Sequence, residues 1–536
     1  MKVFKKNLND FVIEGIQKGW RHIDASVKTN NETFETDVLI IGSGAGGGTA
    51  AEILAKAGLD IIIVEEGPFK TSKDFQMKED EAYSMLYQES ASRQTKDRGI
   101  KIFQGRMVGG GTGINWTTCF RTPASTLNYW SDQMNVNGLT EIEMKPWFEW
   151  VEKRYKIKSW NLTPNINNSL LEKGCKKLGI SFGKISRNVE GCQNLGYCGT
   201  GCPTNAKQST NVTTIPGALA EGAIMISKVR ADKFIIKNGR IDSLKCRSMN
   251  HVGNVPSRNV ITIKAKHYVL AAGGIGSPGI LLRSKNKILN PYGIVGKRTF
   301  LHPVNLSGAI MPYKVYGEYG APQTSFSDHF IDTRINNEKS GFKLECPPLQ
   351  PMLVATNLEG HGSFHAKIMK KRPFLQVLIA LQRDGFHHES IGGKVYLKKD
   401  GSPGLDYKVS RYVWNGIRDS FYVMADIQFA AGAKAVSPVH RNAGFYSSPL
   451  KAKNAISSLP METLKARLFS AHVMGGCPMG EDREKSVVNS EGAHHEVENL
   501  SVFDGSIFPT SIAANPMESI FAITAKFSTK LAKKLL

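Results

Sequence analysis

Three glycines and one glutamate near the start of the chain have the spacing of a nucleotide-binding turn. Gly42, Gly44 and Gly47 form the pattern G-x-G-x-x-G, and Glu65 follows them about 20 residues on. Glycines at this spacing allow a tight turn and let the backbone approach a pyrophosphate, while an acidic side chain binds a ribose hydroxyl. These four residues predict the binding of a dinucleotide.

The segments around these glycines are those of a strand–helix–strand unit. Residues 38–41 (VLII) and 61–64 (IIIV) are apolar runs typical of buried parallel strands. Residues 49–57 between them are small and alanine-rich, as a helix packed closely on a sheet requires. The glycine pattern alone is weak evidence, because any glycine-rich turn can carry it. The flanking strands and the acidic residue in register favour a dinucleotide-binding unit.

The composition is that of an ordinary globular chain of 536 residues, with 41% hydrophobic and 22% charged residues. Two lobes are expected, because a single core stops growing at about 250–300 residues. The net charge of +22 could attract nucleic acid or an anionic membrane. The lysines are scattered, however, and no nucleic-acid motif is present. We therefore expect a solvated basic surface, whose one dense cluster is Lys367, Lys370, Lys371 and Arg372.

The start of the chain and its cysteines indicate the compartment. Residues 1–20 contain lysines but no apolar core of a secretory signal. No window approaches about 18 uninterrupted apolar residues, so no membrane-spanning helix is expected. Eight cysteines in so long a chain without a signal favour a reducing compartment. We expect a cytoplasmic protein, with peripheral contact to the inner face of the membrane left open.

Glycine-rich and polar segments recur in the middle and at the end of the chain. Residues 105–115 (GRMVGGGTGIN) form a second glycine cluster, and residues 268–272 predict a strand that enters the glycine turn 273–278. Leu500–Phe503 predicts a strand with a polar end at 504–506. Residues 305–470 contain alternating strands, among them 374–381 and 394–397, and no cofactor motif.

These segments predict an α/β fold in which the nucleotide-binding domain is discontinuous and a substrate domain is inserted. The nucleotide-binding domain would combine residues 35–120, 205–300 and 480–536 after a leader of residues 1–34. Residues 121–204 would form a helical and cysteine-containing loop region, and residues 301–479 an α+β substrate domain built on an antiparallel sheet. Asn238-Gly239 predicts a hairpin turn, and Asn515-Pro516 predicts the cap and first turn of a closing helix.

Taken in order, the motifs resemble those of the glucose–methanol–choline (GMC) flavin oxidoreductases. The dinucleotide unit is followed by GRMVGGGTGIN at 105–115, AAGGIGSPGILLRS at 271–284, SAHVMGGCPMG at 470–480 and FDGSIFPTSIAANP at 503–516. The resemblance covers about residues 36–530 and is closest to the bacterial and long-chain-alcohol-oxidising branch. It implies a Rossmann-like domain that binds FAD and the oxidation of an alcohol to an aldehyde or ketone by hydride transfer to N5 of the flavin.

The resemblance also assigns roles to residues. His472 matches the active-site histidine, which would accept the hydroxyl proton, and Asn515 matches its partner position. A histidine suits proton transfer because its ordinary pKa is about 6.5, and an asparagine amide can bind the alcohol oxygen without titrating. Without the resemblance they would be a core histidine and a helix cap. The residues expected to hold FAD are Gly42, Ser43, Gly44, Gly47, Glu65, Arg106, Val108, Gly109, Gly110, Asn115, Val229, Asp504 and Gly505.

Noncovalent binding of FAD is expected from one position. Some members of this family attach FAD through a histidine directly before the asparagine of the first signature, and that position is Ile114 here. Isoleucine has no nucleophilic atom that could form the bond. No metal site is expected. The remaining histidines are expected to be surface or structural residues, among them His302, His387, His388, His494 and His495.

Three cysteines between residues 192 and 202 leave several interpretations open. Cys192, Cys198 and Cys202 are spaced C-x5-C-x3-C-P, which partly resembles iron–sulfur ligation. The spacing differs from the common runs, and no fourth cysteine lies nearby for a cluster or for zinc. The segment is most similar to a loop of the alcohol-oxidising branch. A structured loop over the flavin is favoured over a cluster or a disulfide.

The substrate is indicated by one apolar segment. Residues 346–354 (CPPLQPMLV) lie in the predicted substrate domain and lack charges suited to a polyol or a quaternary ammonium. With the resemblance this favours a hydrophobic or long-chain alcohol, although the segment could be ordinary core. Alternatives are a sterol or sugar alcohol dehydrogenase, a cyanohydrin-type lyase of the same fold, and a basic membrane- or nucleic-acid-binding protein on a degenerate flavin fold. The electron acceptor would be quinone or oxygen, with a dehydrogenase favoured over an oxidase.

Overall fold

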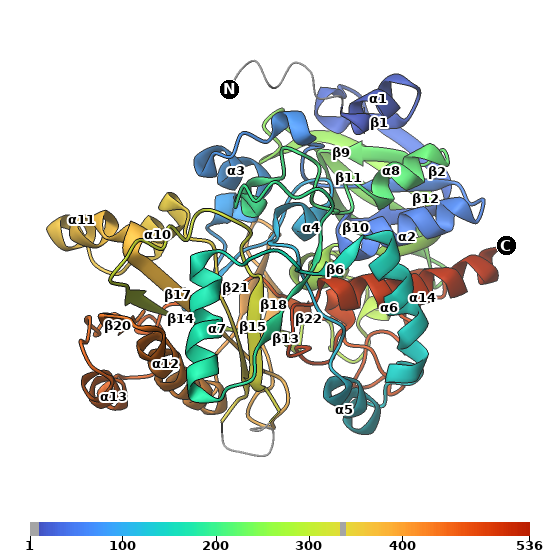
Figure 1. The fold of residues 1–536 in the computed structure, drawn as a ribbon. Coiled ribbons are helices and arrows are strands. Elements are labelled where there is room, and N and C mark those ends of the chain that lie inside the picture. Colours follow the sequence, from blue (N-terminus) through green and yellow to red (C-terminus); the bar gives the residue numbers. More distant parts are fainter. Residues whose placement is uncertain (1–9, 333–338) are drawn as a thin grey trace.

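Two eight-stranded sheets organise the chain, one in each of two lobes (Figure 1). The computed structural model describes residues 10–332 and 339–536. The first sheet has the order β1-β9-β3-β2-β12-β11-β10, with β23 also paired to β12. Its strands are β1 (Arg21–Asp24), β2 (Glu32–Ile41), β3 (Ile61–Val64), β9 (Ile224–Ser227), β10 (Val229–Lys237), β11 (Arg240–Met249), β12 (Pro256–Leu270) and β23 (Leu500–Val502).

The centre of this sheet is parallel and fully apolar, as the sequence predicts. Strand β2 pairs in parallel with β3 and with β12, and residues 38–41 and 61–64 are buried. Strands β10 and β11 form an antiparallel hairpin in which Lys237 opposes Arg240, so the predicted Asn238-Gly239 turn is confirmed. Both turn residues have positive φ, 48° and 76°, which asparagine and glycine tolerate. The predicted α/β fold is confirmed, and its sheet combines strands from the start, the middle and the end of the chain.

Some segments take part in the sheets beyond their predicted boundaries. Residues 21–24, predicted as part of a leader, form β1 and pair in parallel with β9. The second sheet recruits β4 and β7 from outside residues 301–479. Such edge strands are short, so their apolar pattern is too brief to reveal them in the sequence.

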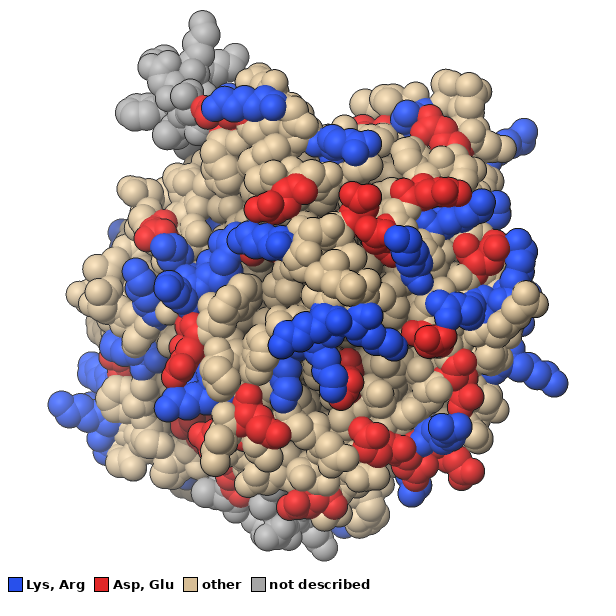
Figure 2. All heavy atoms as spheres, turned by 90° about the vertical axis from the view of Figure 1, so that its right-hand side faces the viewer, with Lys and Arg blue, Asp and Glu red and all other residues tan. Residues whose placement is uncertain are grey.

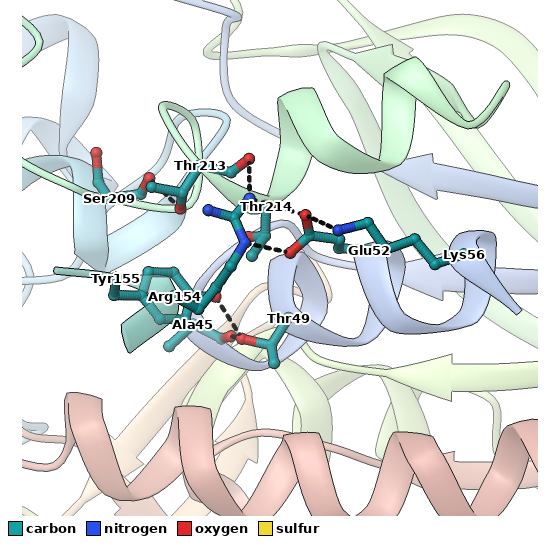
Figure 3. A network of polar contacts seen from close by, with 9 residues as sticks. All are labelled: Ala45, Thr49, Glu52, Lys56, Arg154, Tyr155, Ser209, Thr213 and Thr214. Carbon is teal, nitrogen blue, oxygen red and sulfur yellow. Dashed lines mark hydrogen bonds and ion pairs between the residues drawn. The ribbon is translucent and has the colours of Figure 1, made fainter. Parts of the chain in front are cut away.

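Four helices lie on one side of the first sheet, namely α2 (Ala45–Lys56), α6 (Glu141–Arg154), α8 (Thr214–Ala220) and α14 (Met517–Leu535). Glu52 of α2 is buried and receives two hydrogen bonds from Arg154, at 2.7 and 2.8 Å, and one from Lys56 (Figure 3). The ring of Tyr155 stacks on Phe521 of α14 with centroids 3.8 Å apart. These contacts fix the helix that begins at the glycine turn.

The second sheet belongs to the substrate lobe. Its order is β4-β21-β14-β17-β16-β15-β7, with β20 on β14. The strands are β4 (Ile100–Ile102), β7 (Gly183–Lys184), β14 (Val304–Ile310), β15 (Ser325–Phe330), β16 (Phe342–Glu345), β17 (Leu375–Gln382), β20 (Ala435–Pro438) and β21 (Leu468–Ser470). The predicted strands 374–381 and 394–397 are confirmed as β17 and β18 (Lys394–Leu397).

Alternate residues of this sheet serve its two faces. Asn305 and Ser307 of β14 hydrogen-bond to Ser420 and Gln428 of α12 (Arg411–Ala431), which covers one face together with α7 (Ile166–Leu178) and α13 (Pro449–Ser458). Leu306 and Gly308 therefore point to the opposite face, toward the other lobe. An antiparallel α+β substrate domain is confirmed.

The remaining elements connect and border the lobes. They are α1 (Phe11–Gln17), α3 (Glu79–Leu86), α4 (Gly110–Ile114), α5 (Ala124–Met134), α9 (Gly273–Arg283), α10 (Pro351–Asn357) and α11 (Gly362–Lys370), with β5 (Thr118–Cys119), β6 (Ile157–Ser159), β8 (Ser186–Asn188), β13 (Thr299–Phe300), β19 (Pro403–Asp406) and β22 (Met474–Gly475). Within the described ranges, no helix combines the length and apolar character that a membrane crossing requires.

The charged surface agrees with the scattered lysines of the sequence. Figure 2 shows Lys and Arg interspersed with Asp and Glu over the face that bears α14 and the first sheet. Many of these charges are paired at the surface, for example Arg121 with Glu152 at 2.7 Å and Lys266 with Asp37 at 2.7 Å. This face is a solvated one, and it does not present one continuous basic patch.

Candidate active site

A cavity of about 940 Å³ is lined by both lobes. From the first lobe come the glycine turn, α4, the start of α9 and residues 504–505, and from the second come β14 and β17. His472 and Asn515 line the same cavity. The structure thus brings the predicted nucleotide-binding residues and the predicted catalytic pair to one site.

The glycine turn leaves space at one position and is closed at others. A Cβ atom on Gly42 would lie 2.3 Å from the carbonyl oxygen of Ala271, and one on Gly47 would lie 1.9 Å from that of Gly42. A Cβ on Gly44 would meet only the Cα of Gly110, at 3.9 Å, and would project into the cavity. Gly44 therefore provides room at the N-terminus of α2, where a pyrophosphate is expected. The turn fits a bound dinucleotide.

Glu65 lies at the end of β3 with its carboxylate against the turn. It accepts hydrogen bonds from the Ser43 hydroxyl at 2.7 Å and from the Gly67 backbone N–H at 3.0 Å. Burial raises the pKa of Glu65, and these hydrogen bonds oppose that rise. The carboxylate is held at the cavity wall, where it can accept a hydrogen bond from a ribose hydroxyl.

Most of the predicted FAD-binding residues line the cavity, and three lie behind its wall. Gly47, Val108 and Gly109 are not among the lining residues. The Val108 N–H donates to the Pro68 carbonyl at 3.0 Å, and the Gly109 N–H donates to the Ser43 hydroxyl at 3.0 Å. These three shape the turns. The residues that reach the cavity are Gly42, Ser43, Gly44, Glu65, Arg106, Gly110, Asn115, Val229, Asp504 and Gly505.

Asp504 joins the end of the chain to the start of α9. Its carboxylate accepts hydrogen bonds from the Gly273 N–H at 2.8 Å and the Ser277 hydroxyl at 2.6 Å through one oxygen. The other oxygen accepts the Ser506 N–H at 2.7 Å. The glycine-rich start of α9 and residues 504–506, which are distant in sequence, are therefore fixed together at the cavity.

His472 is paired with a second histidine, His302. The two Nδ1 atoms lie 3.1 Å apart, and Nε2 of His472 is the ring nitrogen left to meet the cavity. Burial and the positive charge of Lys343 lower the pKa of His472 to about 4. Burial also places the pKa of His302 well below its ordinary value. Both rings are therefore neutral near pH 7, and a neutral His472 can accept a proton.

A buried carboxylate fixes the position of His302. Asp384 accepts the backbone N–H groups of Leu301 and His302, each at 3.1 Å, and the Tyr407 hydroxyl at 2.8 Å. These bonds hold His302 at φ 48°, in the left-handed region, which aims its ring at His472. His302 was expected to be a surface or structural residue, and the structure places it in the interior, in contact with His472. Its apolar neighbours in the sequence, Phe300 and Leu301, were the available sign of burial.

Asn515 is held by a buried glutamate. Its amide Nδ2 donates to Oε2 of Glu345 at 3.4 Å, and Gln323 donates to the same oxygen at 2.6 Å. The Asn515 Oδ1 atom is buried with no partner among the described residues. Asn515 is not the cap of α14, because the helix begins after Pro516. The prediction of a cap at Asn515 is wrong, and its Oδ1 atom is left to serve the site.

Glu345 has a buried cation two residues away on the same face of β16. The ammonium of Lys343 lies over the Phe120 ring, 2.9 Å from its centroid, and over that of Phe326 at 4.4 Å. Burial raises the pKa of Glu345, and the positive charge of Lys343 opposes the rise. Burial lowers the pKa of Lys343. Neither residue was predicted at the site, since two charges in a short strand give no sign that they face inward.

The far end of the cavity is apolar. Its wall is the face of the second sheet that points away from α12, together with the proline-rich segment 347–350 and helices α10 and α11. The segment 346–354 predicted at the substrate site therefore lines it in part. The apolar sheet residues on this wall are Val304, Leu306, Leu375, Val377, Ile379 and Leu381.

The cysteine loop lies against the cofactor end. Gly199 and Thr200 line the cavity, and Tyr87 donates to the Gly199 carbonyl at 2.6 Å. The buried ammonium of Lys207 donates to the carbonyls of Gly113, Asn115 and Cys198, which ties the loop to α4. Cys192, Cys198 and Cys202 are free thiols in this structure. A structured loop beside the cofactor agrees with these contacts, and the role of the thiols stays a prediction.

Comparisons with known proteins agree with this geometry. Two family models described as GMC oxidoreductase match residues 83–304 and 390–524, and a model described as FAD binding domain matches residues 37–75. The long-chain-alcohol oxidase FAO3 of Arabidopsis thaliana is 28% identical over 96% of this chain and 70% of its own length. The uncharacterized GMC-type oxidoreductase y4nJ of Sinorhizobium fredii is 26% identical over 92% of this chain and 94% of its own.

Solved structures show the same fold at lower identity. Pyridoxine 4-oxidase from Mesorbium loti superimposes with a TM-score of 0.66 and 16% identity, covering 92% of this chain and 99% of its own. A formate oxidase variant from Aspergillus oryzae gives a TM-score of 0.67 at 14% identity, covering 95% and 100%. The matched models span both lobes and the cofactor turn. The chain is therefore a member of the GMC oxidoreductase family of flavoenzymes.

Proposed function

We propose that this enzyme oxidises a hydrophobic, long-chain alcohol to the aldehyde or ketone with noncovalently bound FAD. The observation that carries the proposal is the apolar sheet face that continues the cavity beyond His472. An alkyl chain gains about 0.8 kcal/mol for each CH₂ group it buries on such a wall. The names of the relatives, which include long-chain-alcohol oxidases of Arabidopsis thaliana, support the same substrate class.

Bound FAD would supply the two-electron acceptor for the carbon–hydrogen bond. The glycine turn, Glu65 and Asp504 would hold it from the first lobe. His472 accepts the hydroxyl proton at Nε2, since burial keeps the ring neutral and its Nδ1 is engaged by His302. Asn515, held by Glu345, orients the alcohol oxygen. The apolar wall excludes water and positions the chain.

A panel of alcohols added under anaerobic conditions tests the proposal. Primary alcohols should bleach the flavin absorbance. The rate constant of flavin reduction, divided by the dissociation constant of the alcohol, should rise with the length of the alkyl chain. A cyanohydrin-type lyase would leave the flavin oxidised with every alcohol. Peroxide release equal to dye-linked turnover would identify oxygen as the acceptor, and its absence would favour a quinone.

One glycine on the apolar wall allows a sharper test of chain length. A Cβ on Gly308 would meet no atom within 4 Å, so Gly308→Val should fold and extend into the cavity. The variant should lose about tenfold in efficiency on the longest alcohols and keep its efficiency on short ones. Gly308→Ala is the graded control, because its single methyl group projects less far into the cavity and should have a smaller effect on the longest alcohols. Equal effects on short and long alcohols would show that the alkyl chain of the substrate does not bind along this wall.

A further inference from the structure

Helices α10 and α11 form a hairpin at the outer edge of the substrate lobe, where Figure 1 shows them projecting from the left of the molecule. None of the residues of α10 is buried, although the helix carries Met352, Leu353 and Val354. Its first turn is held instead by Glu79, which accepts the N–H groups of Met352 and Leu353 at 2.7 and 2.8 Å. Because α10 is held mainly at its first turn, much of its apolar surface is not packed against the rest of the protein.

The same hairpin forms the outer wall of the cavity. Leu353, Val354, Phe364 and Ile368 line it. Phe364 is also 50% exposed, and Met352 is 38% exposed. Because Phe364 both lines the cavity and meets solvent, it marks a place where the apolar end of the cavity opens.

Unpaired cations follow on the next turns of α11. Lys367, Lys370 and Lys371 are exposed, and no ion pair of the described residues involves any of them. Two acidic residues nearby are paired with arginines, Glu318 with Arg372 at 2.7 Å and Glu359 with Arg467 at 2.8 Å. The hairpin therefore carries net positive charge beside exposed apolar side chains.

Exposed tyrosines border the base of the hairpin. The N–H of Tyr316 donates to the Pro373 carbonyl at 3.0 Å, and the ring of Tyr316 packs edge-on against Tyr319. Their exposed fractions are 38% and 63%. Tyrosines are enriched where a protein meets the membrane–water interface.

We propose that this hairpin docks the enzyme on an anionic lipid bilayer, from which a lipid-dissolved alcohol enters the cavity beside Phe364. The substrate in this statement rests on the proposed function, and the docking does not. Apolar side chains flanked by lysines match the acyl boundary and the anionic headgroups of such a surface. A second copy of the chain is disfavoured as the occupant, because two lysine-bearing hairpins repel each other.

Vesicle co-sedimentation of the FAD-loaded protein tests the docking without any substrate. The protein should bind vesicles that contain phosphatidylglycerol and should not bind vesicles of phosphatidylcholine alone. Lys367→Glu, Lys370→Glu and Lys371→Glu together should weaken partitioning by at least about 100-fold, since each lysine adds roughly fivefold near an anionic surface and each glutamate adds repulsion. Equal binding to both vesicles, or none to either, would overturn the proposal.

A matched charge change elsewhere provides the control. Lys173, Lys176 and Lys177 are exposed on α7, away from the cavity mouth, and no ion pair within the described ranges involves them. Their combined change to Glu should weaken partitioning far less. If partitioning onto vesicles falls as much in the α7 variant as in the α11 variant, the binding depends on the net charge of the protein and not on the hairpin. Dimerisation that the α11 changes abolish would show that a second copy occupies the surface.

Insertion and substrate transfer have separate measurements. Phe364→Trp should shift its emission to the blue on phosphatidylglycerol vesicles and be quenched by brominated acyl chains. The α11 lysine variant should oxidise a vesicle-borne long-chain alcohol at least tenfold more slowly than wild type and a soluble short alcohol at the same rate. Bound vesicles with no flavin reduction by any alcohol would reject the proposed function and leave the docking intact. An unchanged tryptophan spectrum would reject the insertion.

Discussion

The Nδ1 atoms of His302 and His472 lie 3.1 Å apart, so the two neutral rings share one hydrogen between them. For His472 to accept a proton at Nε2, its own Nδ1 must donate, and His302 must therefore be the acceptor. His302 thus sets which nitrogen of His472 is basic. Asp384 and Tyr407 stand behind it and fix its backbone.

Changes at these two histidines should separate cofactor binding from proton transfer. His472→Ala should retain FAD and slow flavin reduction by about 100-fold or more, the scale of a positioned base. His302→Ala should slow reduction about tenfold, and His302→Asn should recover part of the loss because its amide oxygen can accept. Stopped-flow reduction under anaerobic conditions measures each rate.

The control for these variants is His440, a buried histidine that also lines the cavity. Its Nε2 hydrogen-bonds to the Pro460 carbonyl at 2.9 Å and does not contact His472. The flavin of the His440→Ala variant should be reduced at nearly the wild-type rate. If the flavin of the His472→Ala variant is reduced at that same rate, His472 does not take part in the mechanism.

Gly44→Val should give a folded protein without FAD. The new side chain meets only open cavity in the protein, but it would occupy the space of the pyrophosphate. The ratio of flavin to protein absorbance and the far-ultraviolet circular dichroism measure cofactor and fold together. Gly444→Val, at an open glycine outside the turn, should purify yellow. A yellow Gly44→Val protein at full stoichiometry would show that the cofactor lies elsewhere.

The flavin should be released by acid. Ile114 lines the cavity beside Asn115 and offers no atom for a covalent bond. The Cys119 thiol is buried, and burial raises its pKa, so it is a poor nucleophile. Trichloroacetic acid should give a yellow supernatant and a white pellet. A flavinyl peptide after proteolysis of the pellet would contradict this prediction.

Three buried histidines should each destabilise the folded protein as the solution is acidified below pH 6.5. Burial lowers the pKa of His267, His472 and His494 from 6.5 to about 4, so the folded protein binds fewer protons than the unfolded chain between these values. Stability is then lost as pH falls through this window, by about 3 kcal/mol for each residue. Urea unfolding between pH 7 and pH 4 measures the loss.

A variant isolates one of these histidines. His267 hydrogen-bonds to Ser501 at 3.0 Å, and His267→Gln keeps a polar group there without a titrating ring. The slope of unfolding free energy against pH should become shallower in this variant. Parallel slopes for wild type and His267→Gln would show that His267 is not held neutral by folding.

Local patterns were sufficient for much of the fold. The glycine turn, the strands beside it and the Asn238-Gly239 hairpin each depend on neighbours in the sequence, and all were predicted. Strand β17 followed from its apolar run. Such elements are fixed by periodicity and turn chemistry, which a single sequence displays.

The inner partners of the catalytic pair could not be predicted in this way. His302 meets His472 across 170 positions, and Glu345 meets Asn515 across another 170. Their proximity depends on how β14 and β16 lie in the second sheet. Asn515 preceded a proline and matched a helix cap locally, but burial beside Glu345 decided its position. Tertiary contacts of this range leave no local trace.

Strand β12 has consequences for the order in which the lobes are completed during synthesis. Its neighbours are β2 and β11, which are made before it, and β23, which is made near residue 500. Ribosomes add roughly 5–20 residues per second, so the apolar edge of β12 waits many seconds for its last neighbour. Every strand of the second sheet is already made by residue 470. The substrate lobe can therefore fold first, and the cofactor can be loaded only when the final strand and α14 close the other lobe.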